Sequence, residues 1–257
     1  MGIGEAAAGV LAAPGVKLAL VARSGGKLEK VAVGVKERGG EAFIIQADLS
    51  SPEDAARVVP EALKVLGGVD VLINNAGVGN AGTVAAMKME TMRHVMEVNL
   101  FSVVRLMQDV IPAMREQGGG HIINISSVVS KISLPTAGGY SASKFALNGI
   151  SDAARVELAG ENIKVTTLCP GVVKSNFHGN LLGGKRKPPV GSGGWTPEQV
   201  ALAISRAVNK PTREKVLGGG NKVLVGLSRI SPGLVAWILG RIYERRLKPS
   251  LTDDASR

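Results

Sequence analysis

The sequence predicts an α/β fold, with a doubly wound parallel sheet in a three-layer α/β/α arrangement. Strand-like apolar runs alternate with helix-like segments along most of the chain, a pattern that produces right-handed βαβ crossovers. Aromatic residues make up only 3% of the chain, so the core must consist mainly of Val, Leu, Ile and Ala, as in buried parallel strands. The length of 257 residues suits one large α/β domain.

The amino-terminal part predicts a helix followed by two strands and the helix between them. Residues 4–13 are small and apolar, and the turn at 14–15 (Pro-Gly) ends this helix. The apolar run 17–22 predicts a strand. Residues 27–38 have helical spacing and stop at two glycines, and 42–46 predict the next strand.

The middle of the chain continues the alternation. Ser-Pro-Glu-Asp at 51–54 begins a helix, with proline at the first helical position. Strands are expected over 69–73 and 121–125, and one long helix over about 89–115 separates them. No internal repeat or low-complexity linker interrupts the series.

After these elements we expect a helix over 140–158, a strand over 163–168 and then a long loop. The loop, residues 182–195 (LGGKRKPPVGSGGW), is rich in glycine and proline. Open α/β sheets bind ligands beyond the carboxyl ends of their strands, so this loop is either a substrate lid or an inserted segment without function. The sequence leaves both interpretations open.

We expect a single catalytic domain over residues 1–230 and a basic, apolar extension over 231–257. The first half of the extension is apolar nearly all round and contains Trp237, whereas its second half is basic. It is too short to span a bilayer but suits contact with an anionic membrane surface through residues 231–248. A packed extension or a dimer contact is the other interpretation, and the sequence slightly favours it.

Charge and cysteine content limit the classes of function. The formal net charge is +10, but there is no nucleic-acid-binding motif, and we expect no nucleic-acid partner. Cys169, the one cysteine, excludes an intrachain disulfide and fits a reducing compartment, so we expect a cytoplasmic protein with membrane contact at most at the surface. The three histidines are too scattered to form a metal site.

Tyr140 and Lys144 are candidates for acid–base chemistry. They lie four residues apart on an expected helix and therefore share a face. An ammonium beside a phenol favours tyrosinate, so we expect Lys144 to lower the pKa of Tyr140. Ser127 follows the strand 121–125, and its hydroxyl can donate to a carbonyl oxygen as negative charge develops there.

Several motifs occur together in a fixed order: Asn-Asn-Ala-Gly at 74–77, Val-Asn-Leu at 98–100, Ile-Ser-Ser at 125–127, Tyr-x-x-x-Lys at 140–144 and Pro-Gly at 170–171. In this order and spacing the chain resembles the short-chain dehydrogenase/reductase family over nearly its whole length. The resemblance implies a Rossmann-type fold, a nicotinamide cofactor and hydride transfer between an alcohol and a carbonyl. It also implies a homodimer or homotetramer, with the helices around 89–115 and 140–158 at the interface.

The resemblance assigns catalytic roles to four residues. Tyr140 would donate or accept the proton, and Ser127 would hydrogen-bond the substrate oxygen. Lys144 would hold the nicotinamide ribose and lower the pKa of the tyrosine. Asn99 would place a water molecule in the proton relay.

A second set would bind the cofactor. Asp48 would contact adenine, Asn75–Gly77 would line the adenosine side, and Pro170 to Val173 would contact the nicotinamide. The full set is Gly2, Ile3, Gly4, Arg23, Asp48, Leu49, Asn75, Ala76, Gly77, Tyr140, Lys144, Pro170, Gly171, Val173 and Ser175, the last where the family usually has Thr.

Arg23 predicts the choice of cofactor. NAD-dependent proteins of this fold have an acidic residue at the end of the second strand, which binds the ribose 2′-OH. Here Ala22 holds that position and Arg23 follows it. A guanidinium pairs well with a 2′-phosphate, so we expect NADP(H) rather than NAD(H). A surface arginine without this role is the alternative.

The sequence departs from the family at its start. Residues 1–5 (Met-Gly-Ile-Gly-Glu) match only the end of the glycine-rich turn, and the first strand is absent. That strand is central in the sheet, so its absence leaves the edges of two neighbouring strands without partners. We expect either a natural start further upstream or a variant impaired in cofactor binding, and the intact downstream motifs favour the former.

Two functions therefore remain. The favoured one is an NADP(H)-dependent oxidoreductase that acts on a small carbonyl or alcohol substrate, which is lipid-like if the extension contacts a membrane. The alternative is a non-catalytic dinucleotide-fold protein that binds a partner or a membrane surface. The intact set of Asn99, Ser127, Tyr140 and Lys144 favours the enzyme.

Overall fold

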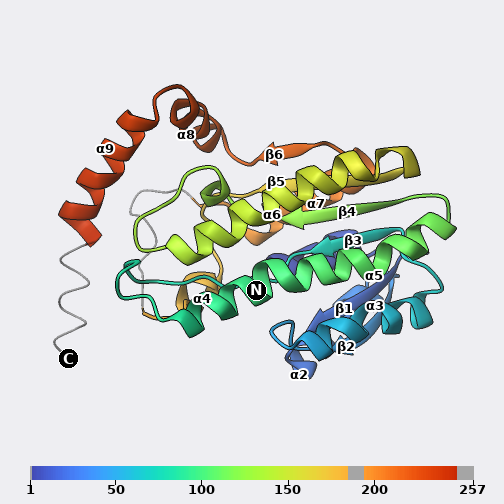
Figure 1. Ribbon diagram of the computed structural model, residues 1–257. Coiled ribbons are helices and arrows are strands. Elements are labelled where there is room, and N and C mark those ends of the chain that lie inside the picture. Colours follow the sequence, from blue (N-terminus) through green and yellow to red (C-terminus); the bar gives the residue numbers. More distant parts are fainter. Residues whose placement is uncertain (1, 185–193, 248–257) are drawn as a thin grey trace.

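Parallel strands form the centre of the computed structural model, which describes residues 2–184 and 194–247 (Figure 1). The four-stranded part has the order β3 (Val71–Asn74), β4 (Gly120–Ile125), β5 (Ile163–Cys169) and β6 (Glu214–Val216). A separate two-stranded part pairs β1 (Lys17–Ala22) with β2 (Glu41–Gln46). Every strand pair is parallel, which confirms the predicted α/β class.

The sheet is divided between β1 and β3. Each of these strands has one neighbour, β2 for β1 and β4 for β3, and within the described residues no strand pairs with the other edge of either. This division is the result expected for a doubly wound sheet without its central first strand. Both edges therefore carry backbone groups that no ladder hydrogen bonds satisfy.

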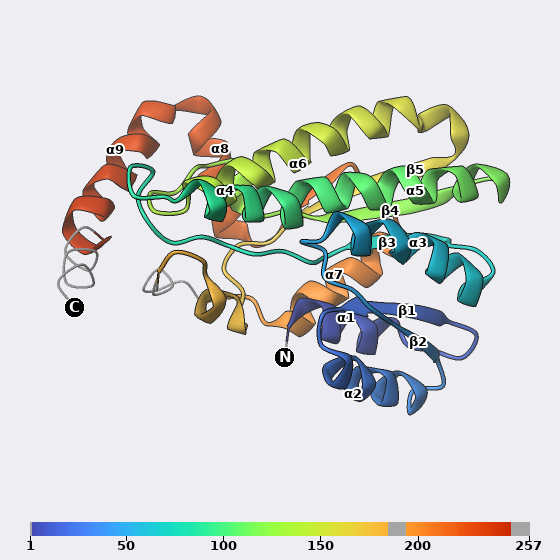
Figure 2. The same ribbon diagram turned by 60° about the horizontal axis from the view of Figure 1, so that its bottom comes forward.

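Helices cover both faces of the sheet. Neighbouring residues on a strand point to opposite faces. Ile122 accordingly packs with α3 (Pro52–Leu66), α5 (Ser102–Glu116) and α6 (Gly138–Glu157), whereas Ile123 packs with α1 (Ile3–Leu11) and α7 (Pro197–Asn209). The remaining early helix, α2 (Gly25–Lys36), lies beside β2 (Figure 2). These layers make the three-layer α/β/α arrangement that the sequence predicts.

The expected helix over 89–115 is not continuous. It consists of α4 (Met89–Met96), a π-helical segment (Glu97–Phe101) and α5. A π-helical turn shifts the side chains that follow it relative to a regular helix, and such turns are frequent at functional sites. This segment carries Asn99, which is fully buried.

The elements after β5 were not predicted individually. They are α7, β6, α8 (Gly219–Ile230), α9 (Pro232–Ile242) and a final π-helical segment (Tyr243–Leu247). A capping box at Thr196 and Gln199 with a first-turn proline begins α7. Most of the loop that we interpreted as a lid or an insertion, residues 185–193, lies outside the described residues.

No single helix among the described residues is long and apolar enough to cross a membrane. Taken together, the helices Gly219–Ile230 and Pro232–Arg245 are long and apolar enough for a membrane span, but the chain bends by 120° between them.

Candidate active site

The four predicted catalytic residues come together at the carboxyl ends of β3 and β4. Ser127 lies two residues after the end of β4 and is the N-cap of a 3-10 turn, Val128–Ser130. Tyr140 and Lys144 lie in the first half of α6. Asn99 comes from the π-helical segment between α4 and α5.

Asn99 connects two segments of this site. Its Oδ1 accepts from the Val78 N–H at 2.8 Å, and its Nδ2 donates to the Val78 carbonyl at 2.8 Å and to Ser143 Oγ at 2.9 Å. A Cβ on Gly77 would lie 3.2 Å from Asn99 Oδ1 and 3.7 Å from Lys144 Nζ. The loop after β3 therefore lies directly against both side chains.

Lys144 is buried, and its Nζ donates to the Ile125 carbonyl at 2.9 Å. Burial disfavours the ammonium and lowers the pKa of Lys144 to about 8. The Nζ lies 6.0 Å from the centre of the Tyr140 ring. The side chain is thus fixed beside the tyrosine by the last carbonyl of β4.

Tyr140 does not have the lowered pKa that we expected from the Lys144 ammonium. Burial raises its pKa to about 12, and the hydrogen bond with Ser127 opposes this only in part. Burial makes the charged phenolate unfavourable, and this outweighs any lowering of the pKa by Lys144, whose Nζ is engaged with a carbonyl. Tyr140 therefore keeps its proton at neutral pH, the form that a proton donor to a carbonyl needs.

An aromatic ring and a buried amide lie beside Tyr140. The Phe177 ring lies 5.3 Å from the Tyr140 ring, centre to centre. The backbone N–H of Tyr140 donates to Asn80 Oδ1 at 2.7 Å, and Asn80 is itself buried. Asn80 thus fixes the start of α6, a role that its isolated position in the sequence did not reveal.

Ser127 joins the catalytic group to the expected nicotinamide segment. Its Oγ lies 3.4 Å from the Pro170 carbonyl, which also accepts from the Val128 N–H at 2.9 Å. The same Oγ accepts from the Val129 N–H at 3.3 Å. The end of β4 and the end of β5 are therefore held side by side at this serine.

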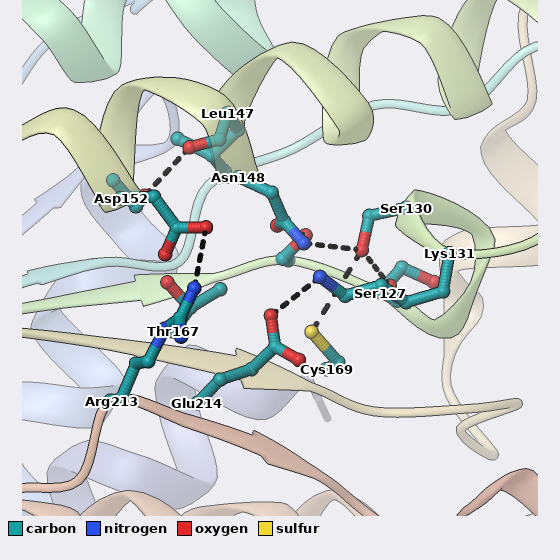
Figure 3. Close-up of polar contacts among 12 residues, drawn as sticks. Ser127, Ser130, Lys131, Leu147, Asn148, Asp152, Thr167, Cys169, Arg213 and Glu214 are labelled. Carbon is teal, nitrogen blue, oxygen red and sulfur yellow. Dashed lines mark hydrogen bonds and ion pairs between the residues drawn. The ribbon is translucent and has the colours of Figure 1, made fainter. Parts of the chain in front are cut away.

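A buried polar network supports the turn that carries Ser127 (Figure 3). Ser130 Oγ donates to the Ser127 carbonyl at 2.6 Å and lies 3.8 Å from Cys169 Sγ. The Asn148 amide lies 2.6 Å from Ser126 Oγ and 3.0 Å from Ser130 Oγ. Cys169 is buried, as we expected, and its pKa is raised by burial, which argues against a nucleophilic role.

An ion pair completes this network. Lys131 Nζ lies 2.6 Å from Glu214 Oε2, and both side chains are mostly buried. The pair connects the residue after the Ser127 turn to β6. Sequence reasoning missed Lys131, Asn148 and Glu214. The spacing of Asn148, one helical turn after Lys144, was an available signal, but nothing in the sequence pointed to Glu214.

The expected phosphate-binding residues lie at the start of α1. Gly2 is the N-cap of this helix, and no side chain caps it. Helix N-termini of this kind bind phosphate through free N–H groups. A Cβ on Gly4 would lie 2.8 Å from Asn75 Nδ2, so Gly4 lies against the loop after β3. Ala76 is exposed there.

Arg23 and Asp48 lie at the carboxyl ends of β1 and β2. Arg23 is exposed, and its carbonyl accepts from Gln46 Nε2 at 3.0 Å. The Ser50 N–H lowers the pKa of Asp48 most, and the nearby charge of Arg23 adds to this effect. Asp48 Oδ1 accepts from that N–H at 2.9 Å. Leu49 packs against the core.

The remaining predicted residues line the segment after β5. Pro170 and Val173 are buried, and Gly171 lies so close to α8 that a Cβ would be 2.2 Å from Asn221 Nδ2. Ser175 is the N-cap of the 3-10 turn Asn176–Asn180. It also lines an open groove of about 530 Å³ together with Lys174, Asn176, Thr196, Pro197 and Glu198.

This arrangement fits a nicotinamide dinucleotide. At Gly77 a Cβ would fill the space beside Asn99 and Lys144. At Gly4 a Cβ would fill the space beside Asn75. Close approach of a ligand to backbone requires such positions. Arg23 supplies an exposed cation at the end of β1. Among the described residues, no cluster of His, Cys, Asp or Glu has the geometry of a metal site.

Comparison with known proteins agrees with this geometry. The family model for short chain dehydrogenases matches residues 1–184. The chain is 35% identical to mouse (Mus musculus) dehydrogenase/reductase SDR family member 7B, over 91% of this chain and 75% of that protein. It is 32% identical to the ketoacyl reductase HetN of a Nostoc species, over 94% of this chain and 84% of that protein.

Solved structures show the same fold. The alcohol dehydrogenase of the archaeon Thermococcus sibiricus, complexed with 5-hydroxy-NADP, superposes with a TM-score of 0.75 at 31% identity, covering 84% of this chain and 91% of that one. A metagenomic short-chain oxidoreductase in complex with NADP gives a TM-score of 0.71 at 31% identity, covering 84% of this chain and 92% of that one.

Proposed function

The chain belongs to the short-chain dehydrogenase family, whose members oxidise CH–OH groups or reduce carbonyls, and we propose that it is an NADP(H)-dependent carbonyl reductase or alcohol dehydrogenase. The observation that carries the proposal is the convergence of Asn99, Ser127, Tyr140 and Lys144 on one buried site. A protein released from catalysis has little need to keep four such residues together in one site.

In the proposed reaction the cofactor, when bound, supplies the hydride for carbonyl reduction or accepts it in alcohol oxidation. Ser127 donates a hydrogen bond to the substrate oxygen and so stabilises the charge that develops on it. Tyr140 transfers its proton to the same oxygen. Its pKa of about 12 keeps the proton available until charge builds up on the substrate.

Lys144 and Asn99 restore the proton. The pKa of Lys144, about 8, lies close enough to neutrality for its ammonium to pass a proton toward Tyr140. The Asn99 side chain makes hydrogen bonds with both the N–H and the carbonyl of Val78. We propose that this orients a water molecule between Lys144 and solvent.

Arg23 is the basis for preferring NADP(H) over NAD(H). It is exposed at the end of β1, next to the position where an acidic residue would bind a ribose 2′-OH, and that position is Ala22. The two solved relatives with NADP-type ligands support the same choice. Gly2 to Gly4, Asp48, Leu49, Asn75 to Gly77, Pro170, Gly171, Val173 and Ser175 would complete the cofactor site.

The substrate is proposed to be a small carbonyl compound or alcohol with an apolar part. Phe177 beside Tyr140 supports this, because it places an aromatic surface next to the reacting group. One relative is named a ketoacyl reductase and another an alcohol dehydrogenase, in keeping with either direction of reaction.

Domain organisation, assembly and location are part of the proposal. We place the catalytic domain over residues 1–230 and the extension over 231–257, which contacts a membrane surface through 231–248. Exposed apolar side chains on α6, Phe145, Ile150 and Val156, support a homodimer or homotetramer. The single cysteine supports a cytoplasmic location.

A specific observation keeps the non-catalytic alternative in view. The unpaired edges of β1 and β3 flank the place where a central strand would stand, and loss of this support would weaken dinucleotide binding. The test is consumption of NADPH by the purified chain with a series of aldehydes and ketones. Turnover supports the enzyme, and a complete lack of turnover together with tight binding to a partner supports the alternative.

A further inference from the structure

Helices α8 and α9 together carry six exposed large apolar side chains. Val225 and Val235 are the buried residues of this pair. Ile230 is 86% exposed, Val223 71% and Trp237 61%. The large apolar side chains that these helices present to solvent are Val223, Ile230, Leu234, Trp237, Ile238 and Ile242. A concentrated apolar surface of this kind marks a contact site.

The charge of the same surface indicates the kind of partner. Lys222, Arg229, Arg241 and Arg245 lie on the helix pair, and Glu244 is the one acidic residue in 219–245. The Arg241 guanidinium lies 5.5 Å from the centre of the Trp237 ring. Cationic side chains with long apolar stems beside a tryptophan suit the headgroup region of an anionic bilayer.

The helix pair lies at the substrate end of the sheet. Figures 1 and 2 show α8 and α9 beyond the carboxyl ends of the strands. Ser127, which follows the end of β4, lies at the same end of the sheet. Val225 and Val235 pack against Val128, the first residue of the turn after Ser127, and Ile132, which lies just beyond it. Asn221 at the start of α8 lies against Gly171. The pair thus rests on two walls of the active site.

We propose that α8 and α9 form a docking surface for anionic membranes and that the substrate is an amphiphilic carbonyl or alcohol drawn from the lipid. The 120° bend of the chain between the helices suits a pair that lies on the surface with its apolar side chains among the headgroups. The substrate part of this proposal rests on the proposed oxidoreductase function, whereas the docking part does not.

Tryptophan fluorescence tests docking directly, because the chain contains two tryptophans. The variant Trp195→Phe leaves Trp237 as the single reporter. With vesicles of phosphatidylcholine and phosphatidylglycerol, we expect a blue shift of its emission and quenching when the acyl chains are brominated. With phosphatidylcholine alone we expect a much weaker response. No response with anionic vesicles would overturn the proposal.

Matched variants measure separately how much the basic and the apolar side chains contribute to vesicle binding. We expect Arg241→Glu with Arg245→Glu to weaken vesicle binding at least about tenfold, since each basic residue near an anionic surface contributes to binding. Leu234→Ser with Ile238→Ser should also weaken it about tenfold. The controls Val33→Ser and Lys64→Glu change exposed residues on α2 and α3 and should bind like the parent chain. Equal binding by all variants would overturn the proposal.

Two further measurements separate the alternatives. If the face joins two copies of the chain, sedimentation without lipid will show an association that the Leu234/Ile238 variant loses, and docking is then overturned. NADPH titration without vesicles reports the proposed function independently. Finally, the Arg241/Arg245 variant should reduce a long-chain ketone in vesicles at least about tenfold more slowly and a short soluble ketone at the parent rate. Equal effects on both ketones would overturn the proposed substrate class.

Discussion

Lys131 Nζ lies 2.6 Å from Glu214 Oε2, and this ion pair connects the turn that carries Ser127 to the last strand of the sheet. Both side chains are mostly shielded from water. Removing one partner leaves the other charge partly buried without compensation, which is more costly than removing both. The pair therefore holds the turn of Ser127, the proposed hydrogen-bond donor to the substrate, from outside the proposed catalytic group.

Replacement of this pair should affect both stability and turnover. We expect Lys131→Met or Glu214→Gln alone to lower the free energy of unfolding by about 2 kcal/mol and to lower kcat more than KM. The double variant should recover part of the stability. Urea unfolding and steady-state kinetics check this. If the losses in free energy of unfolding caused by the two single substitutions simply add in the double variant, a direct interaction is contradicted.

Tyr140→Phe should abolish turnover while leaving the fold and NADPH binding intact. Removing the proton donor should cost about 10²- to 10⁴-fold in kcat. The chain offers a matched control, because Tyr243 is the other of its two tyrosines and lies in the final π-helical segment. Tyr243→Phe should keep the parent kcat. An equal loss of kcat in both variants would show that Tyr140 is not the proton donor.

The stability of the fold should rise with pH through the titration of Lys144. Its pKa in the fold is about 8, whereas an unfolded lysine titrates near 10.4. Between these values the unfolded state binds more protons, so raising the pH favours the folded state. From pH 7 to 9 the gain should be about 1 kcal/mol in the parent relative to Lys144→Met. Urea unfolding at both pH values measures it, and a gain of equal size in Lys144→Met would assign the effect to other groups.

Arg23→Ala should weaken NADPH binding selectively. A charge-assisted hydrogen bond to the 2′-phosphate is worth about 1.5 to 3 kcal/mol, which corresponds to roughly a 10- to 100-fold rise in Kd. NADH lacks this phosphate and should bind the variant as it binds the parent. The control is Lys36→Ala, which removes another exposed cation, at the end of α2. Equal weakening for NADPH and NADH would show that Arg23 does not select the cofactor.

The sequence predicted the fold class because its signals were local. The strand expected over 17–22 is β1 (Lys17–Ala22), and the strand expected over 163–168 is β5 (Ile163–Cys169), one residue longer. Apolar runs bounded by turn residues define such strands well. The given sequence shows no match to the family's first strand, and the division of the sheet between β1 and β3 agrees with this.

Other features depend on contacts between distant segments, which a pattern search does not detect. The Lys131–Glu214 pair joins residues far apart in the chain. The pKa of Tyr140 was wrongly expected to fall, because helical spacing shows that Lys144 is near but shows neither how deeply the phenol is buried nor that Nζ binds the Ile125 carbonyl. The π-helical segment around Asn99 was expected to be ordinary helix, since no residue there breaks the helical pattern.

The most direct test of the proposed function is a fluorescence titration of the chain with NADPH and with NADH. We predict saturable binding of both cofactors, with NADPH bound at least about tenfold more tightly at low salt because of Arg23. Arg23→Ala should bring the two affinities together. If neither cofactor binds the folded chain or a form extended upstream at the genomic locus, the oxidoreductase proposal is contradicted and a non-catalytic role for this fold takes its place.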